Sequence, residues 1–452
     1  MNTINKQIIS HSIPVSMLLI AIGSVVPYMK PEVPIASPLD NTTLWWSVST
    51  LILIVFFLSK YFFFDKRNDD NMLIIWIYLL WNVMCIVRGM FVAELYWDWK
   101  ALIGNTMTLL MPIIIFSSTN KMVVQSLLAF YMKFALPLFL FFGLIIRTDA
   151  FGFYLIPVSF LLFFLPVLTK RQRVLILCAT VIVLVSDLGA RSNVIKFGVP
   201  FFILSVYYLK TKIPVKMMEA MRLAFFIIPF VFFGLGVSGV FNVLNVSEYV
   251  KGDFTSMGVD QEGNRVEQDV IADTRTFLYI EVLESAVINN YWLAGRTPAR
   301  GNDSDAFGEF GAVLTGRYER VSNEIGLANI FTWTGVVGVI LYFLIFFRAS
   351  FLAVNKSQNI YAKMLGIYIA FRWLYSWLED INNFTLNYFM LMVMIGLCFS
   401  YSFRNMTDQE ITIWARGIFD VRYVRLQQYL FKKNNNEKRE YSGLAALPHQ
   451  EK

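Results

Sequence analysis

Histidine and cysteine are both scarce in this chain of 452 residues. Only two histidines occur, His11 and His449, and both lie near the chain ends. Since histidine is the commonest general base and a frequent zinc ligand, its absence elsewhere excludes most histidine-dependent catalysis and zinc chemistry there. A general base in the interior of the sequence therefore has to be a carboxylate. The three cysteines, Cys85, Cys178 and Cys398, each fall inside an apolar run and indicate no disulfide framework.

The scarcity of charge places the chain among membrane proteins. Charged residues make up 16% and hydrophobic residues 57% of the sequence, which is too apolar for a soluble protein of this length to cover itself with polar surface. The formal net charge of +7 does not indicate nucleic-acid binding, because the cations lie in short loops and in the tail, as the topology of a membrane protein requires.

Apolar runs that are long enough, as helices, to cross about 30 Å of hydrocarbon recur along the chain. They predict an all-α polytopic protein with about twelve transmembrane helices. These helices lie near residues 12–29, 44–64, 72–92, 102–118, 124–146, 150–169, 173–188, 194–210, 221–243, 325–347, 360–380 and 384–403. The chain thus divides into helices over 1–243, a large loop over 244–324, further helices over 325–403 and a basic tail over 404–452.

The loops that separate these runs alternate between cation-rich and cation-poor, which predicts the orientation. By the positive-inside rule both termini are cytoplasmic and the large loop faces outward. A loop of this length between membrane spans is more often functional than a mere connection, so we expect the chemistry there. Its middle, Asp273 to Asn290, has helical spacing of apolar residues, with Asp273 or Thr274 as a cap.

Two arginines at the predicted outer surface are the first candidates. Arg191 lies in a polar interruption, Ser186 to Asn193, where an arginine near hydrocarbon needs a counter-ion and is a functional hypothesis by default. A snorkelling Arg191 paired with Asp187 is an equal alternative. Arg275 opens the helical segment of the large loop, and here the alternative is a solvated arginine on a surface helix.

The rest of the loop adds cations and one candidate base. Arg296 and Arg300 lie next to glycines, in a cationic backbone suited to a phosphate. Glu324 lies where the loop returns to the membrane, so desolvation and nearby arginines would shift its pKa in opposite directions. The alternative role of Glu324 is an ion pair with Arg317 or Arg320.

Charged residues in or beside other predicted helices complete the set. Arg88, Arg372, Glu379 and Asp380 indicate either an internal ion-pair network or an acceptor-binding surface. Structural pairing is favoured for Arg372, and Glu379 and Asp380 are the alternative bases. The stretch Asn302 to Asp305 contains an Asp-x-Asp that could bind a divalent cation, but such triplets are common in acidic loops, and we expect neither a metal nor a cofactor.

These motifs, in this order, resemble the O-antigen polymerase and O-antigen ligase superfamily of membrane glycosyltransferases, with a GT-C-like fold. The resemblance rests on Gly189-Ala190-Arg191, Thr274-Arg275, Leu293-Ala294-Gly295 and the closing Gly335-Val336-Val337-Gly338. The family's ligases have a histidine before the closing motif, and its position here is occupied by Glu324. This departure favours a polymerase, in which a carboxylate accepts the proton of the acceptor.

The resemblance implies an undecaprenyl-pyrophosphate-linked glycan donor and transfer to a glycan or to a lipid A-core acceptor at the outer face of the bacterial inner membrane. It implies that Arg191 and Arg275 hold the pyrophosphate, where fixed guanidinium groups stabilise the departing charge, and that Glu324 is the base. Membrane lipids and a chain-length regulator are further expected partners. The substrate-binding candidates are Arg88, Arg296, Arg300, Arg317, Arg320, Glu379 and Asp380.

A polysaccharide flippase or other transporter is the alternative of a different class. Transporters commonly show internal repeats and binding near the membrane midplane, whereas the polar residues here gather in one asymmetric loop. That distribution favours an enzyme. A lateral, lipid-accessible groove under the loop would support the enzyme, and a cavity open alternately to both sides would support the transporter.

The basic tail carries apolar residues at Ile411, Trp414, Ile418 and Leu426. Two interpretations are open for it. The apolar residues can lie along the inner leaflet, or the tail is solvated and functionally silent, which is the interpretation we favour.

Overall fold

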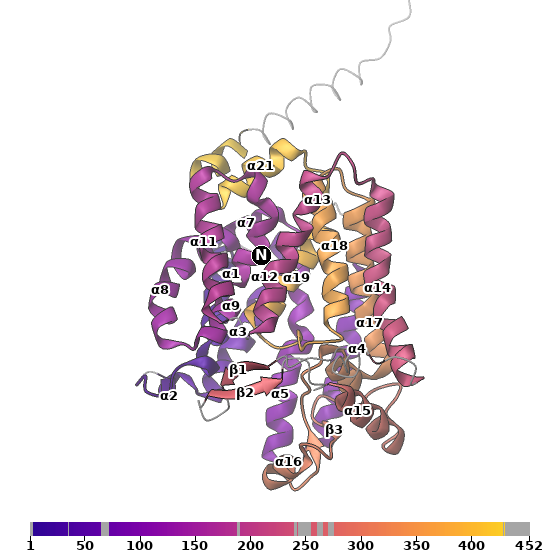
Figure 1. Cartoon of the computed structure of the whole chain (residues 1–452). Coiled ribbons are helices and arrows are strands. Elements are labelled where there is room, and N and C mark those ends of the chain that lie inside the picture. Colours follow the sequence, from indigo (N-terminus) through magenta and orange to yellow (C-terminus); the bar gives the residue numbers. More distant parts are fainter. Residues whose placement is uncertain are drawn as a thin grey trace, which may run out of the picture.

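The structure is a computed structural model, and it describes residues 3–34, 36–64, 72–187, 190–238, 242, 255–259, 265–269, 275–427 and 429. These residues form a bundle of helices (Figure 1). The helices are α1 Thr3–Gly23, α2 Ala36–Leu39, α3 Thr42–Phe63, α4 Leu73–Val92, α5 Tyr96–Leu110, α6 Ile114–Ser118, α7 Lys121–Phe130, α8 Leu136–Ile145, α9 Phe151–Tyr154, α10 Ile156–Leu161, α11 Lys170–Ser186, α12 Arg191–Ile203, α13 Ser205–Tyr208, α14 Val215–Val237, α15 Thr276–Ile288, α16 Gly308–Thr315, α17 Gly326–Asn355, α18 Ile360–Tyr375, α19 Leu386–Phe399, α20 Tyr401–Arg404 and α21 Asp408–Gly417.

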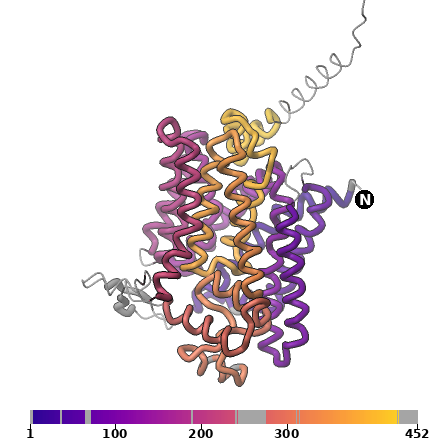
Figure 2. Tube along the Cα trace, turned by 90° about the vertical axis from the view of Figure 1, so that its right-hand side faces the viewer, coloured from indigo at the N-terminus to yellow at the C-terminus, as the bar shows by residue number. Residues whose placement is uncertain are grey.

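Short segments complete the secondary structure. The π-helical turn Tyr131–Ala135 joins α7 to α8, and the 3-10 helix Leu162–Val167 continues α10. Strands β1 (Thr255–Val259) and β2 (Arg265–Asp269) pair antiparallel, as do the two-residue strands β3 (Asn302–Asp303) and β4 (Glu319–Arg320). Elements α15, α16 and β3 lie at one end of the bundle and α21 lies at the other (Figure 1). We call the former end the loop end; Figure 2 shows the same arrangement from the side.

The prediction of an all-α protein with membrane-spanning helices is confirmed, but the count of about twelve spans is not. Within the described ranges seven helices are long and apolar enough to cross a membrane: Ile4–Tyr28, Thr42–Phe63, Leu73–Val92, Tyr96–Ser118, Lys121–Ile145, Val215–Val237 and Gly326–Asn355. An eighth is present if Thr148–Tyr154 and Ile156–Val167, which meet at 58°, form one broken span.

Helices do occur at the other predicted positions, but they are short. Helix α11 has 17 residues, α12 has 13, α18 has 16 and α19 has 14. Every residue of α19 is buried, as expected of a helix that is apolar on all sides. Because protein rather than lipid surrounds it, its length does not have to match the bilayer.

Helix α17 packs against α4, α14, α18 and α19. It is broken at Gly335, whose φ of 68° and ψ of −172° are not helical. The loop that follows α15 satisfies the freed backbone groups, since the N–H of Val336 donates to the carbonyl of Trp292 (2.8 Å) and the N–H of Arg296 to that of Thr332 (2.7 Å). A broken helix in a membrane protein is tolerated only with such partners.

Two glycines allow this contact between the loop and the broken helix. A Cβ at Gly335 would lie 2.3 Å from the carbonyl oxygen of Leu293, and a Cβ at Gly295 would lie 2.5 Å from the carbonyl carbon of Trp333. Both glycines have positive φ, 68° and 69°, which costs glycine nothing. Arg88 of α4 closes the contact by donating to the carbonyls of Ala294 (2.7 Å) and Gly295 (3.2 Å).

The two placements predicted for the apolar residues of the C-terminal tail, along the inner leaflet or in solvent, are wrong for the first half of the tail. Ile411, Trp414 and Ile418 are buried within the protein, at 0%, 0% and 3% exposure. The indole of Trp414 donates to the carbonyl of Lys121 (2.9 Å). Helix α21 therefore packs its apolar face against α7 and the segment before α11, while residues of its opposite face such as Asp408 stay exposed. Leu426 is exposed.

Candidate functional site

Charged side chains from three separate elements meet at Glu379, in the connection that follows α18. The Nζ of Lys196, on α12, lies 3.7 Å from its Oε1. The Nη2 of Arg275, at the start of α15, lies 3.8 Å from its Oε2, and the Nε of Arg275 donates to the carbonyl of Leu378 (2.6 Å). The side chain of Lys196 is only 2% exposed, whereas Arg275 and Glu379 are partly open to solvent at 29% and 26%.

A second buried cation lies near this group. Arg372, on α18, is 1% exposed and donates to Asn387 (3.0 Å) and to the hydroxyl of Tyr368 (3.3 Å). Its Nε and Nη2 have no hydrogen-bond partner among the described residues, and its charge acts on that of Lys196. We call Lys196, Arg275, Arg372 and Glu379 the cationic junction: Lys196 and Arg275 pair with Glu379, and the charge of Arg372 acts on Lys196. Three cations, two of them buried, beside the carboxylates of Glu379 and Asp380 leave an excess of positive charge, which suits an anion.

Lys196 was missed from the sequence. It lies inside a predicted span, five residues after Arg191, and the rule that an ionisable residue within an apolar span is a functional candidate would have found it. Arg191 itself is exposed at the first residue of α12, and Leu188 and Gly189 before it lie outside the described residues. The proximity of Arg191 to Arg275 stays a prediction. Lys196, on the same helix as Arg191, and Arg275 both pair with Glu379.

The predicted helix of the large loop is confirmed as α15, but its predicted caps, Asp273 and Thr274, lie outside the described residues. Arg275 occupies the cap position and makes no side-chain cap hydrogen bond. Its guanidinium instead points back to the connection after α18. The helix therefore begins at the residue that joins the loop to the cationic junction.

Asp380 lies directly after Glu379 and is the carboxylate whose acidity is most altered. It accepts from the backbone N–H of Asn382 (3.0 Å) and from the side-chain amide of Asn383 (2.7 Å). Burial raises the pKa of the Asp380 carboxyl to about 6, against the opposing effect of these two hydrogen bonds. A carboxylate with a pKa near neutrality suits general-base chemistry.

Glu324 takes the alternative role that the sequence left open. Its side chain is 59% exposed and pairs with Arg320 at 3.4 Å. The backbone nevertheless passes close to the cationic junction, because the N–H of Gly326 donates to the carbonyl of Glu379 (3.1 Å). The structure thus directs the Glu324 side chain to Arg320, and a catalytic role for it stays a prediction.

An apolar pocket of about 250 Å³ adjoins the cationic junction, between α14, α15 and α18. Its walls include Thr276 and Leu378, the immediate neighbours of Arg275 and Glu379 in the chain, and the aromatic rings of Phe233 and Trp377. Other wall residues, such as Phe232, Val237 and Ile280, are exposed on the outer surface. A charged group and an apolar pocket thus lie side by side at the loop end.

A second, polar cavity of about 540 Å³ lies beside the contact between the loop and α17. Three predicted substrate-binding arginines, Arg88, Arg296 and Arg300, line it. Arg296 pairs with Asp303 (2.8 Å) and with Glu319 (3.1 Å), and Arg300 also pairs with Glu319. These arginines therefore hold the fold of the loop as well as the wall of the cavity. Asparagines and a half-exposed tryptophan share that wall: Asn289, Asn290 and Trp292.

The acidic triplet proposed as a cation site is used within the loop. Burial raises the pKa of the Asp303 carboxyl, but the hydrogen bond and the charge of Arg296 outweigh this effect and hold the pKa below its usual range. Asp303 also accepts from Ser285 and Asn289. In the part of the chain that the structure describes, no group of three or more histidine, cysteine, aspartate or glutamate side chains could hold a metal ion.

The remaining two arginines of the loop tie it to the bundle or to itself. Arg317 pairs with Asp98 of α5 (2.9 Å) and with Glu94 (2.6 Å). Arg320 lies over the ring of Phe307, 4.2 Å from its centroid. Both were predicted to bind substrate, and the contacts in the structure give them a role in holding the loop.

Comparisons of the chain with protein-family models, with curated proteins and with solved structures found no match. The described residues form a helical protein with several helices long and apolar enough to cross a membrane, which presents a cationic junction beside an apolar pocket at one end.

Proposed function

We propose that the chain is a membrane glycosyltransferase that polymerises or transfers an oligosaccharide carried on undecaprenyl pyrophosphate, with the loop end at the outer face of the bacterial inner membrane. The observation that carries this proposal is the adjacency of the cationic junction and the apolar pocket, which share the chain neighbours Arg275-Thr276 and Leu378-Glu379. A polyprenyl pyrophosphate has the matching shape, with an anionic head that needs fixed cations and a long apolar tail.

The proposed reaction is a displacement at the anomeric carbon of the donor sugar. A hydroxyl oxygen of the acceptor forms the new glycosidic bond, and the bond from that carbon to the pyrophosphate oxygen breaks. The lipid pyrophosphate leaves with the electron pair. Because its charge grows as it leaves, the fixed cations Arg275, Lys196 and Arg372 stabilise the transition state more than the bound donor.

The proton of the acceptor hydroxyl goes to a carboxylate. Glu324, Glu379 and Asp380 are the predicted candidates. Glu379 pairs with Lys196 and Arg275, and the raised pKa of Asp380 favours Asp380 over Glu324. The polar cavity lined by Arg88, Asn290 and Trp292 lies at the same end of the bundle and is where the glycan of the acceptor would lie. A polymerase is the preferred assignment, and a ligase that transfers the glycan to lipid A-core is the alternative.

A transporter is the second alternative, and the shape of the loop end argues against it. The apolar pocket opens beside exposed apolar residues of α14 and α15, which is the arrangement of a groove entered from the membrane beneath the loop. A transporter would instead need a polar route through the bundle.

The surface glycans of a deletion strain test the proposed function. Single repeat units on the lipid core indicate a lost polymerase. Core without any repeat units, together with accumulated lipid-linked polymer, indicates a lost ligase. Unchanged surface glycan and unchanged lipid-linked pools would overturn the proposal.

The apolar pocket has its own test, Gly236→Trp. A Cβ at Gly236 meets nothing within 4 Å, so the helix tolerates a side chain, and here that side chain fills the pocket. We expect transfer to fall roughly tenfold to a hundredfold, because a displaced tail shifts the pyrophosphate, and a misplacement of about 1 Å can cost 10² in rate. The measurement is turnover of purified lipid-linked donor.

The matched control is Gly234→Trp on the same helix. A Cβ there also meets nothing within 4 Å, but Gly234 does not line the pocket. Equal turnover by Gly236→Trp and Gly234→Trp would show that the donor tail does not bind in this pocket.

The identity of the base is tested by Asp380→Asn against Glu324→Gln. General-base assistance is typically worth about 10²–10⁴ in rate, so the variant of the true base should lose about that factor and still bind donor. We expect the loss in Asp380→Asn. A base works in its deprotonated form, so wild-type transfer should fall as the pH drops through about 6, the pKa of Asp380. A normal rate for Asp380→Asn together with a slow Glu324→Gln would return the role to Glu324.

A further inference from the structure

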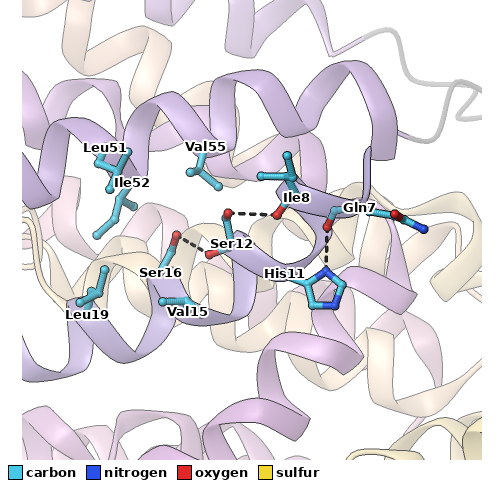
Figure 3. A pocket seen from close by; sticks show the side chains of 10 residues that line it. All are labelled: Gln7, Ile8, His11, Ser12, Val15, Ser16, Leu19, Leu51, Ile52 and Val55. Atoms are coloured by element: carbon cyan, nitrogen blue, oxygen red, sulfur yellow. Dashed lines mark hydrogen bonds between the residues drawn. The ribbon is translucent and has the colours of Figure 1, made fainter. Parts of the chain in front are cut away.

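A groove of about 610 Å³ runs between α1 and α3, on the surface of the bundle (Figure 3). One end carries polar side chains, among them Gln7 and His11, and the other end carries apolar ones, among them Val15, Leu19 and Leu51. Both helices belong to the segments that are long and apolar enough to cross a membrane. The groove is thus an amphipathic depression in a surface that faces lipid.

The polar end offers hydrogen-bonding groups that the protein does not use up. His11 Nδ1 donates to the backbone carbonyl of Gln7 (2.8 Å), which leaves the Nε2 of the neutral ring as a hydrogen-bond acceptor for another partner (Figure 3). The hydroxyls of Ser12 and Ser16 donate instead to carbonyls of their own helix, at 3.0 Å and 2.9 Å, so these serines need no partner in the groove. His11 and the exposed amide of Gln7 are the groups left to bind a polar ligand.

The charge at this end is positive. Lys6 precedes Gln7 in α1, is exposed, and extends across to α3, where its Nζ lies 5.9 Å from the ring centroid of Phe63. Neither α1 nor α3 contains an aspartate or a glutamate. An anion that approaches the polar end therefore meets the cation Lys6 and the amide of Gln7, and no acidic side chain of these two helices.

The length of the groove matches one lipid tail. From Gln7 to Leu19 the groove follows twelve helical steps, which at 1.5 Å each is about 18 Å. One leaflet of a bilayer has about half of the ~30 Å of hydrocarbon. An acyl chain laid from the polar end toward Leu19 and Leu51 would thus fill the apolar part of the groove.

We propose that this groove holds one anionic phospholipid, with its phosphate at Lys6 and Gln7, its headgroup beside His11, and one acyl chain along Val15 and Leu19. The polar end determines which lipid binds. The acyl chain contributes no selectivity, because the surrounding bilayer is as apolar as the groove. The occupant is a lipid rather than a helix of another protein, since the basic, donor-rich end matches a phosphate. This site is independent of the proposed transferase.

The test is native mass spectrometry of the full chain, released from vesicles of equal parts phosphatidylglycerol and phosphatidylethanolamine. We expect wild type to retain one phosphatidylglycerol. Val15→Trp fills the groove and should remove this lipid. Lys6→Gln with His11→Gln should reduce the retained phosphatidylglycerol by about fivefold or more, since one cation near an anionic headgroup contributes about that factor.

Val83→Trp is the matched control. Val83 lies on α4, another membrane-spanning helix, and is 43% exposed, against 42% for Val15. It should retain phosphatidylglycerol as wild type does, and a comparable monodisperse elution of both variants shows that both fold. Equal lipid retention by Val15→Trp and Val83→Trp, or retention of phosphatidylethanolamine in place of phosphatidylglycerol, would overturn the proposal. A Val15→Cys variant that cross-links to a second protein chain in cell membranes would also overturn it.

Discussion

Arg275→Ala is expected to abolish glycan transfer while the protein stays in the membrane at its normal level. Arg275 joins the connection after α18 through two different nitrogens, one to Glu379 and one to the carbonyl of Leu378. In the proposed reaction its charge stabilises the departing pyrophosphate. Removing one preorganised donor of this kind costs about 10²–10³ in kcat, and a near-total loss is expected here because the donor head also loses its orientation.

The kinetic form of this loss is specific. A group that acts on the departing charge lowers kcat and kcat/KM together, whereas a group that only binds the donor raises KM. Arg275→Lys should rescue poorly, because lysine keeps the charge but lacks the planar fork that makes both contacts. Arg191→Ala is expected to give the same loss if Arg191 also faces the pyrophosphate.

The measurement is turnover of purified lipid-linked donor, with membrane abundance determined on the same samples. Arg422→Ala is the control, since its side chain is 87% exposed and follows α21, at the end of the bundle opposite the loop. Near-normal turnover by Arg275→Ala, or full activity of Arg275→Lys, would contradict a role in holding the pyrophosphate.

Gly335→Ala is expected to prevent the accumulation of folded protein. The backbone at Gly335, with φ of 68° and ψ of −172°, lies in a region that is essentially restricted to glycine. Forcing another residue into it costs roughly 1–3 kcal/mol. In addition, its Cβ would lie 2.3 Å from the carbonyl oxygen of Leu293, so the loop has to withdraw and the hydrogen bonds that satisfy the broken helix are lost.

Gly295→Ala should have the same effect from the other side of the contact, because its Cβ would lie 2.5 Å from the carbonyl carbon of Trp333. Gly234→Ala is the control, since a Cβ there meets nothing within 4 Å and alanine favours a helix interior over glycine by about 1 kcal/mol. The measurement is the monodisperse yield and the Tm of each variant in detergent. A Gly335→Ala protein with the wild-type Tm would contradict the role of this break.

Some features of the site were predictable from the sequence because they depend on local pattern. The helical spacing after Asp273 predicted α15, and the large polar loop predicted where charged groups would gather. The sequence also showed the glycines of the closing motif, Gly335 and Gly338, but it did not predict the structural role of Gly335 in the break of α17. That Leu293 to Gly295 packs into the break at Gly335 depends on the approach of two backbones, which neither stretch specifies alone.

The roles of individual charges were less predictable. Arg296, Arg300, Arg317 and Arg320 were all predicted to bind substrate, with an ion pair as the alternative only for Arg317 and Arg320. In the structure each of the four pairs with a carboxylate. Glu324 also lies in a pair. A sequence gives the sign of each charge, but an ion pair requires two side chains within about 4 Å, and that distance is set by the packing of the chain around them.

The sequence by itself determined that this protein is a helical membrane protein with one large polar loop, because hydrophobicity and its period are properties of consecutive residues. Only the tertiary structure decided that Lys196 of α12 and Arg275 of the loop pair with Glu379 beside an apolar pocket, where the charge of Arg372 of α18 also acts on Lys196. These residues come from segments far apart in the chain. Their meeting depends on how α12 and α15 pack against α18, and packing is a cooperative property of the whole bundle that no single segment encodes.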